Sequence, residues 1–224
     1  MTLILAPAEE ADVLKLAAIY YDSFRYDPYD RALFSDTHKE DAVNYLAEDD
    51  LYAIRNDPQT RVIKVTESGT NEIIGYARWE VPFKFESEEA REKAKRPNAL
   101  PPFPASANGA LGTHFQTQLS ERKKKYMDTE KDYTLVIIVV SPAYQGKGAG
   151  SILLKYGIEK ADRDGARIYL TAAAAGYEIY EKKGWKSLDD TIVVDAEQWG
   201  LPNGGISKTV CMMRDAVKAS GHDS

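Results

Sequence analysis

A short glycine-rich stretch carries the clearest chemical signal in this sequence. It reads SPAYQGKGAGS from Ser141 to Ser151, with glycine at every second position from Gly146 to Gly150. The β-branched run Tyr133 to Val140 precedes it, and a segment with apolar residues at helical spacing follows it. Such a loop exposes backbone N–H groups at a helix N-terminus, where the helix dipole also favours negative charge. We therefore predict an anion-binding site at this loop.

Two common nucleotide-binding motifs do not explain the loop. A P-loop requires Ser or Thr directly after its lysine, but Lys147 is followed by Gly148. A dinucleotide fingerprint requires a third glycine at the position where Ser151 stands. The pattern that does fit is Gln-x-x-Gly-x-Gly, formed by Gln145, Gly148 and Gly150.

With this pattern the loop resembles the pyrophosphate loop of the GNAT superfamily of acetyl-CoA-dependent N-acetyltransferases. A second segment, from Ala175 to Trp185, resembles the family's Tyr-x-x-x-Gly-[Phe/Trp] ending. The two segments occur in the family's order and at about the family's spacing. The long insertion before Tyr133 to Val140 is similar to that of a subgroup of fungal members.

The resemblance implies acetyl-CoA as the cosubstrate and no metal. The glycines of the loop let the backbone approach the pyrophosphate without a Cβ in the way. Lys147 is expected to add positive charge or to reach the 3′-phosphate, and the backbone of the central strand is expected to bind the pantetheine arm. The residues expected to contact acetyl-CoA are Ile138, Val139, Val140, Gln145, Gly146, Lys147, Gly148, Ala149, Gly150, Ser151, Gly176, Tyr177 and Tyr180.

Tyr180, in the second segment, is the expected general acid. Attack of an amine on a thioester releases a thiolate, and a phenol held near the sulfur can protonate it. By the resemblance, the family uses a tyrosine at this position for that task, and Tyr180 matches it. Tyr177, one turn earlier, is expected to pack or to form a wall of the cosubstrate site.

The general base is not evident from the sequence. Many family members carry a glutamate on the central strand, but Tyr133 to Val140 contains no carboxylate. Histidine has an unperturbed pKa of roughly 6.5, which suits deprotonation of an ammonium group, so His114 is one candidate for a catalytic base. Glu80 is a second candidate, and a chain of water molecules to bulk solvent is an equal alternative.

The surrounding elements predict a single α/β domain over residues 1–224. Its fold class is a mixed, mostly antiparallel sheet, splayed at its middle, with helices on both faces. Residues 133–185 are the expected acetyl-CoA-binding core, and residues 84–132 are an expected flap over the acceptor site. Strands are predicted at Leu3 to Ala6, Arg61 to Thr66, Ile73 to Val81, Tyr133 to Val140, Arg167 to Thr171, Thr191 to Asp195 and Ile206 to Met213. Three helices are predicted from Glu9 to Phe24, from Thr37 towards Leu46 with a restart near Leu51, and from Tyr177 to Lys183. A further helical segment is predicted to end in Arg122 to Lys125, and another helix is predicted to follow the glycine loop. Tyr26 to Ser35 is predicted to be a loop.

Composition limits the remaining function classes. The chain has 224 residues, with 29 Lys and Arg against 35 Asp and Glu, and this net charge of −6 argues against a broad nucleic-acid surface. The single cysteine, Cys211, cannot form an internal disulfide and is expected to be a buried apolar residue. No apolar run approaches the roughly 20 residues of a membrane span, and the first residues do not resemble a signal peptide. We expect a cytoplasmic monomer or homodimer that binds neither membranes nor nucleic acid.

The sequence therefore predicts an acyltransferase that moves an acetyl group from acetyl-CoA to the primary amine of a small molecule. Direct attack in a ternary complex is expected. Pro97 to Pro104 and Leu111 to Leu119 are expected to close over the acceptor. Two alternatives are a protein-lysine or N-terminal acetyltransferase, which needs an open groove, and a catalytically weak CoA-binding sensor.

Overall fold

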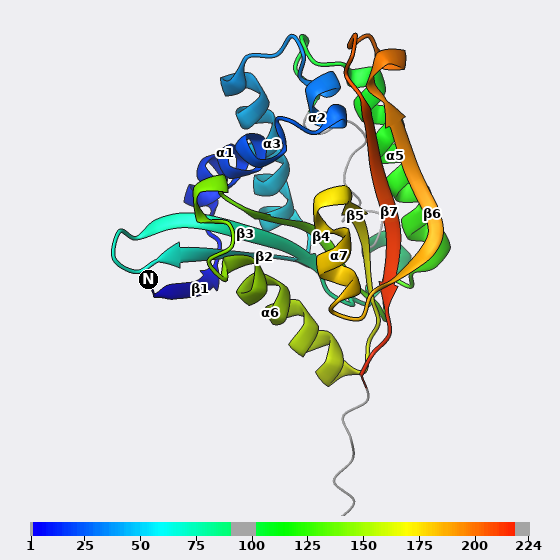
Figure 1. Cartoon of the computed structure of the whole chain (residues 1–224). Coiled ribbons are helices and arrows are strands. Elements are labelled where there is room, and N and C mark those ends of the chain that lie inside the picture. The colour runs from blue at the N-terminus through cyan, green and yellow to red at the C-terminus, as the bar shows by residue number, and fades with distance from the viewer. Residues whose placement is uncertain (1, 91–101, 218–224) are drawn as a thin grey trace, which may run out of the picture.

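Seven strands form one mixed sheet in the order β1-β2-β3-β4-β5-β7-β6 (Figure 1). The computed structural model describes residues 2–90 and 102–217. The strands are β1 (Leu3–Pro7), β2 (Thr60–Glu67), β3 (Glu72–Glu80), β4 (Tyr133–Val140), β5 (Ile168–Ala173), β6 (Lys186–Asp195) and β7 (Ile206–Arg214). Neighbouring strands are antiparallel except for β4 and β5, which are parallel. The predicted fold class is confirmed.

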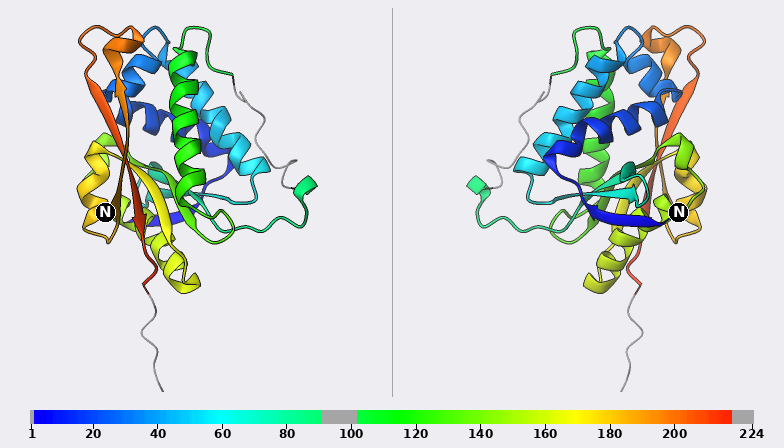
Figure 2. Two further views of the ribbon diagram at one scale, coloured as in Figure 1. Left: turned by 90° about the vertical axis from the view of Figure 1, so that its right-hand side faces the viewer. Right: turned by 90° about the vertical axis from the view of Figure 1, so that its left-hand side faces the viewer.

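Helices cover both faces of the sheet. They are α1 (Val13–Phe24), α2 (Pro28–Leu33), α3 (Lys39–Asn56), α5 (Gly109–Tyr126), α6 (Ala149–Asp164) and α7 (Ala174–Glu181), with short 3-10 helices at Glu10–Asp12, Pro142–Tyr144 and Ala196–Trp199. Successive strand residues point to opposite faces, and α1 packs against Val62 and Tyr76 whereas α6 packs against Ile63 and Ala77. Figure 2 shows α5 beside α3, and α3 packs against α1 on the same side of the sheet.

Two helical predictions need correction. The predicted loop at Tyr26 to Ser35 is wrong where α2 forms, because Asp27 caps that helix by accepting a hydrogen bond from the backbone N–H of Tyr29, and Pro28 occupies its first turn. The second predicted helix does not restart near Leu51, since α3 runs unbroken from Lys39 to Asn56. The spacing of apolar residues becomes irregular after Leu46, which suggests a break, but the helical backbone hydrogen bonds continue through this part of α3.

The largest hydrophobic cluster lies between the sheet and α6. At its centre the indole of Trp79, on β3, is fully buried. Gly157, on α6, lies directly against this ring, because a Cβ at Gly157 would be 2.4 Å from the indole carbons. The close approach of helix and strand therefore depends on the missing side chain at position 157.

Replacing Gly157 with alanine is expected to cost about 1–3 kcal/mol of stability through overpacking. Helix propensity offsets about 1 kcal/mol of this cost, so the net free energy of unfolding should fall by up to about 2 kcal/mol. Urea unfolding measures it. As a control, Lys155→Ala on the exposed face of the same helix should change stability by less than about 0.5 kcal/mol. A Gly157→Ala protein about 1 kcal/mol more stable than the wild type, as helix propensity alone predicts, would show that the ring moves aside freely.

Candidate active site

The parallel strands β4 and β5 separate after three residue pairs. Tyr133 to Leu135 pair with Ile168 to Leu170, whereas the rest of β4 pairs only with β3 and the rest of β5 only with β7. The register of β3 against β4 skips Val136, which is therefore a bulge. Because a bulge bends its strand, β4 turns away from β5. The two facing edges keep backbone groups that have no strand partner.

The glycine loop prepares an anion site at the start of α6. Gly146 and Gly148 have left-handed backbone conformations, with φ of +74° and +95°, which favour glycine. No atom lies within 4 Å of where a Cβ would stand at either position, so conformation and not crowding requires glycine. The backbone N–H groups from Gly146 to Ser151 have no hydrogen-bond partner among the described residues. Together with the helix dipole, these donors can hold a phosphate group.

Two polar side chains of the loop fold back onto the protein. The Gln145 amide donates a hydrogen bond to the backbone oxygen of Val140 at 3.2 Å, which joins the loop to the end of β4. The Lys147 ammonium donates to the backbone oxygen of Ala143 at 2.9 Å and lies 5.0 Å from the ring centre of Tyr144. The loop conformation is thus fixed by its own side chains.

Tyr180 presents a protonated phenol from α7. A Cβ at Gly176, one turn earlier, would be 2.7 Å from the Tyr180 ring, so the glycine makes room for the phenol along the helix. The ring packs edge-on against Trp185, with 5.8 Å between the ring centres. Burial raises the pKa of Tyr180 to about 12, and its hydroxyl has no hydrogen-bond partner in the described part of the chain. The phenol can therefore act as a proton donor near neutral pH.

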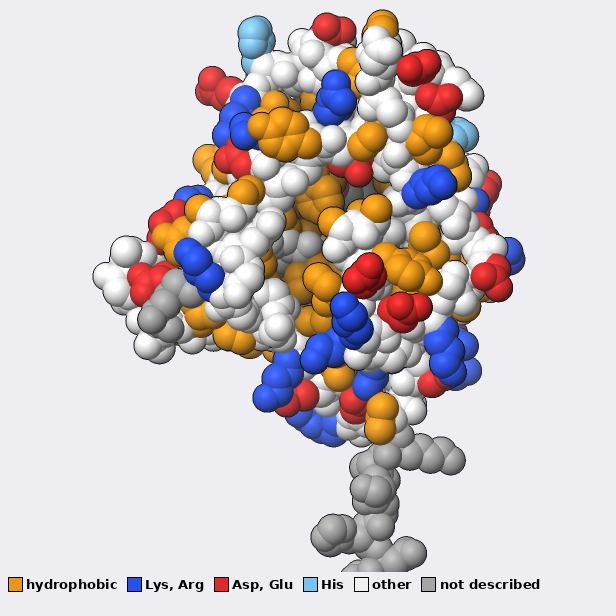
Figure 3. Space-filling model, in the orientation of Figure 1, with side chains coloured by type: hydrophobic (Ala, Val, Ile, Leu, Met, Phe, Trp, Pro, Cys, Tyr) orange, Lys and Arg blue, Asp and Glu red, His pale blue; other side chains and the backbone are white. Residues whose placement is uncertain are grey.

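One cavity of about 1130 Å³ joins these features. Its wall includes the glycine loop, the free edge of β4 and Tyr180. In Figure 3 the face between α1 and α7 is hollowed, and hydrophobic side chains are visible at depth. Of the residues predicted to contact acetyl-CoA, all border this cavity except Lys147 and Tyr177. Tyr177 packs instead against the main hydrophobic cluster.

Seven aromatic residues on or beside α1, α2, α3 and α5 form another part of the wall. We call this part the aromatic chamber, formed by Tyr20, Phe24, Tyr29, Phe34, Tyr45, Phe103 and Phe115. Phe115 lies 4.1 Å from Tyr29 and Phe103 lies 5.0 Å from Tyr45, measured between ring centres. The segment predicted to be a flap therefore supplies one wall, through Phe103 and α5. Of the stretch Pro97 to Pro104, residues 97–101 lie outside the described residues.

A charged cluster beside the chamber was not predicted. Arg78 Nη1 lies 2.6 Å from Asp49 Oδ2 and 3.0 Å from Asp50 Oδ1. Asp50 is 2% exposed and also accepts a hydrogen bond from the Tyr76 hydroxyl. Burial raises the pKa of Asp50 to about 6, although the Arg78 guanidinium opposes this effect. The cluster joins α3 to β3, which are distant in sequence, so spacing alone could not reveal it.

Neither predicted base borders the cavity. His114 is exposed on α5, with its ring centre 5.4 Å from that of Trp199. Glu80, at the end of β3, forms an ion pair with Lys123 of α5. The assignment of either residue as a base stays a prediction.

A sheet that opens beside a glycine-rich helix N-terminus, with a partly buried phenol on the cavity wall, is suited to an acyl-CoA-dependent transferase. The comparison with protein families agrees, because the model of the acetyltransferase (GNAT) family matches residues 15–185. The chain belongs to this family, and it is therefore an acetyltransferase that uses acetyl-CoA.

Solved structures share the fold. The C-terminal condensation domain of Ebony, in complex with beta-alanyl-dopamine, has a TM-score of 0.62 at 10% identity, over 96% of this chain and 100% of that one. The histone acetyltransferase HPA2 and related acetyltransferase from Corynebacterium glutamicum has a TM-score of 0.59 at 18% identity, over 99% of this chain and 100% of that chain. The PaiA N-acetyltransferase from Thermoplasma acidophilum, in complex with coenzyme A, has a TM-score of 0.51 at 12% identity, over 96% and 99%.

Other kinds of site were not found in residues 2–90 and 102–217. No group of three or more His, Cys, Asp or Glu is placed there to hold a metal ion. In the same residues, no helix has the length and apolar character needed to cross a bilayer. Cys211 is fully buried, as predicted, and its sulfur accepts a hydrogen bond from the Tyr169 hydroxyl at 3.4 Å.

Replacing Arg78 with methionine leaves Asp49 and Asp50 without their shared cation. Removal of one partner from a buried ion pair costs about 3–5 kcal/mol, and we expect a loss of that size in urea unfolding at pH 7. Because burial already raises the pKa of Asp50 to about 6 with Arg78 present, that pKa should be higher in the variant. The folded state then binds a proton that the unfolded state releases, so the loss should shrink as the pH falls from 7 to 5.

A surface arginine provides the control for this experiment. Arg55 pairs with Glu10, and both side chains are about half exposed. Arg55→Met should cost less than about 1 kcal/mol at both pH values. If Arg78→Met loses the same free energy of unfolding at pH 5 and at pH 7, the charge of the two carboxylates is not the cause of the loss.

Proposed function

We propose that this protein transfers the acetyl group of acetyl-CoA to the primary amine of a small molecule, by direct attack in a ternary complex. The observation that carries the proposal is the single cavity bordered by both the glycine loop and the aromatic chamber. Two substrates can meet inside it, and holding them together supplies much of the rate acceleration. The one cysteine, Cys211, is fully buried and does not border the cavity, which favours direct attack over a cysteine-linked intermediate.

We assign acetyl-CoA to the side of the cavity formed by backbone groups. The unpaired N–H groups from Gly146 to Ser151 suit its pyrophosphate. The free edge of β4 at Ile138 to Val140 suits the pantetheine arm, because an extended chain with amides can add along a strand edge. The same edge can donate to the thioester carbonyl and stabilise the charge that develops there.

We assign the role of general acid to Tyr180. The neutral amine attacks the thioester carbonyl carbon, the carbon–sulfur bond breaks, and the sulfur takes the proton of the Tyr180 hydroxyl. The nitrogen gives up one proton, and water returns a proton to the phenolate. Because the pKa of Tyr180 is raised to about 12, the phenol is protonated at the start of each turnover. Since His114 is exposed against Trp199, water is the simpler carrier for the departing proton.

The chamber favours a small acceptor over a protein chain. Phe103 and Phe115 close its α5 side by packing on Tyr45 and Tyr29. The Gln116 amide adds a hydrogen bond to the Tyr45 hydroxyl at 3.4 Å. A protein acceptor needs an open groove, and these contacts place a wall along one side where such a groove would run.

Tyr180→Phe removes the acid and keeps the ring. We expect kcat to fall roughly 100-fold, at the lower end of the range for general acid catalysis, with the Kd for acetyl-CoA within about twofold of the wild type. Thiol release from acetyl-CoA with pooled small amines measures kcat, and calorimetry measures Kd. Tyr177→Phe, one turn earlier and outside the cavity wall, is the matched control and should keep its rate. An unchanged rate in Tyr180→Phe rejects the acid assignment. Binding of acetyl-CoA without release by the wild type would favour a protein acceptor or a CoA sensor.

Gly148→Ala tests the glycine loop as the acetyl-CoA site. A Cβ at φ of +95° is strained by about 1–2 kcal/mol, so a distorted loop should bind acetyl-CoA roughly tenfold more weakly. Gly165, at the other end of α6, also has a positive φ of +64° and open surroundings. Gly165→Ala should therefore lose similar stability in a thermal melt and keep its affinity. Equal affinities in the two variants would show that the loop does not hold the cosubstrate.

A further inference from the structure

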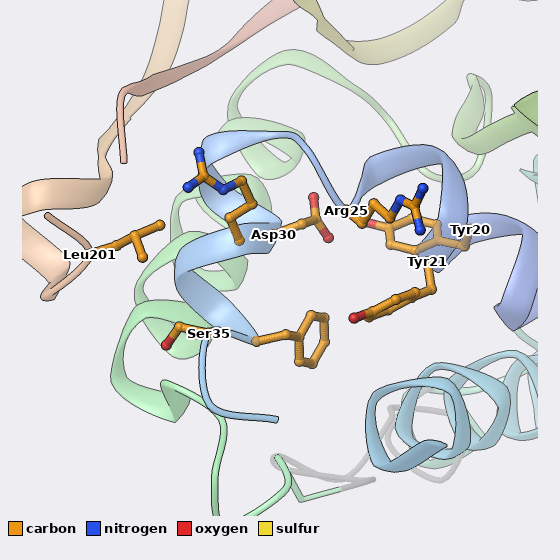
Figure 4. A pocket seen from close by; sticks show the side chains of 8 residues that line it. Tyr20, Tyr21, Arg25, Asp30, Ser35 and Leu201 are labelled. Atoms are coloured by element: carbon orange, nitrogen blue, oxygen red, sulfur yellow. The ribbon is translucent and has the colours of Figure 1, made fainter. Parts of the chain in front are cut away.

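One carboxylate on the wall of the aromatic chamber has no ion-pair partner in the described part of the chain. Asp30, on α2, is 8% exposed and borders both the chamber and a smaller cavity of about 290 Å³. It accepts a hydrogen bond from the Tyr20 hydroxyl on α1. Figure 4 shows the two side chains pointing toward each other. No Lys, Arg or His of residues 2–90 and 102–217 forms an ion pair with it.

Among the described residues, four cations border the two cavities, Arg25, Arg31, Arg78 and Lys183, and none of them contributes to the electrostatics of Asp30. Arg78 is held between the two carboxylates of α3. The Arg25 guanidinium lies 4.7 Å from the ring centre of Tyr26. Arg31 Nη1 donates a hydrogen bond to the backbone oxygen of Gly204 at 3.5 Å. None of these cations neutralises the Asp30 carboxylate.

This arrangement is unfavourable for a charged Asp30 until a cation arrives. Burial raises the pKa of Asp30 well above its usual range, because the carboxylate loses hydration and gains no ion pair. An ammonium group would supply the missing charge, and the faces of aromatic rings also attract cations. Asp27 adds a second carboxylate to the same wall. A carboxylate on the ligand would instead be repelled by the two aspartates of this wall.

We propose that Asp30, held in place by Tyr20, binds the ammonium group of the acceptor, and that the acceptor is a small aromatic amine without a carboxylate. The aromatic body of such an amine packs against rings of the chamber, and its cationic end reaches Asp30. The bound ammonium must lose one proton to water before the neutral nitrogen attacks the thioester. Free amino acids are disfavoured by their carboxylate. This inference rests on the proposed transfer to an amine and names its substrate class.

The test varies the charge of the ligand and the charge of residue 30 independently. The probes are 2-phenylethylamine and its neutral counterpart 2-phenylethanol, titrated by calorimetry into protein saturated with CoA, which has no acetyl group to transfer. The wild type should bind the amine roughly 10- to 100-fold more tightly than the alcohol, as expected for a hydrogen bond to a charged group. Asp30→Asn, which keeps the shape of the side chain, should bind both probes about equally. A purely structural role for Asp30 would weaken both probes by the same factor.

Asp41→Asn is the matched control, because Asp41 is an exposed carboxylate in the first turn of α3. It should keep the wild-type preference for the amine. A wild type that does not distinguish the two probes, or an Asp30→Asn protein that still does, overturns the proposal. If Asp30→Asn does not fold, wild-type kcat/KM for 2-phenylethylamine against L-phenylalanine decides, with the amine expected to be at least about 100-fold better.

Failure of this inference and failure of the proposed function give different results. If the wild type releases CoA with L-phenylalanine and not with 2-phenylethylamine, amine acetylation stands and the acceptor class is wrong. If the amine binds in an Asp30-dependent way and no CoA is released from acetyl-CoA, Asp30 is kept as the ammonium-binding residue. The proposed transfer to a small amine is then rejected.

Discussion

β4 and β5 share hydrogen bonds only up to Leu135 and Leu170, and the rest of the site depends on this early separation. Parallel strands ordinarily bond along their whole shared length, but the bulge at Val136 turns β4 away while its other edge stays paired with β3. A sheet opened in this way gives up hydrogen bonds at its centre and must be held by packing elsewhere. The close contact of Gly157 with Trp79 does this by fixing α6 against the sheet. The N-terminus of α6 is thereby held beside the opening.

The two sides of the cavity differ in the kind of group they offer. The side assigned to acetyl-CoA is built from backbone: the donors of Gly146 to Ser151 and the free edge of β4. The side assigned to the acceptor is built from side chains, with aromatic rings on four helices and carboxylates among them. A fixed, extended cosubstrate can be recognised by its amides and phosphates, which backbone groups match. A compact acceptor is distinguished by its shape and charge, which side chains match.

This difference explains how far sequence analysis reaches. The glycine loop, the strand Tyr133–Val140 and Tyr180 are signalled within short stretches, and the fold class and the bounds of this strand were predicted correctly. The sixth strand was predicted only from Thr191, whereas β6 begins at Lys186. The helix α2 was missed because its six residues are too few to show an apolar period, and only the Asp27 cap before Pro28 indicates it. The aromatic chamber, the Arg78 cluster and the pair of Asp30 with Tyr20 assemble residues from separate elements, so no spacing reveals them. For the same reason His114 could not be placed relative to the cavity before the structure was known.

Because backbone groups form one side of the cavity and side chains form the other, the two sides are expected to evolve differently. Most substitutions replace a side chain and leave the main chain where it is, so a site made of N–H groups and strand edges tolerates sequence drift outside the glycines that its loop requires. The aromatic residues around the acceptor lie on or beside α1, α2, α3 and α5. These helices pack on the sheet and are not part of it. Mutations there can exchange one amine for another while the inherited acetyl donor site stays intact. Descendants of such a chain can therefore diversify in substrate choice faster than they diverge in chemistry.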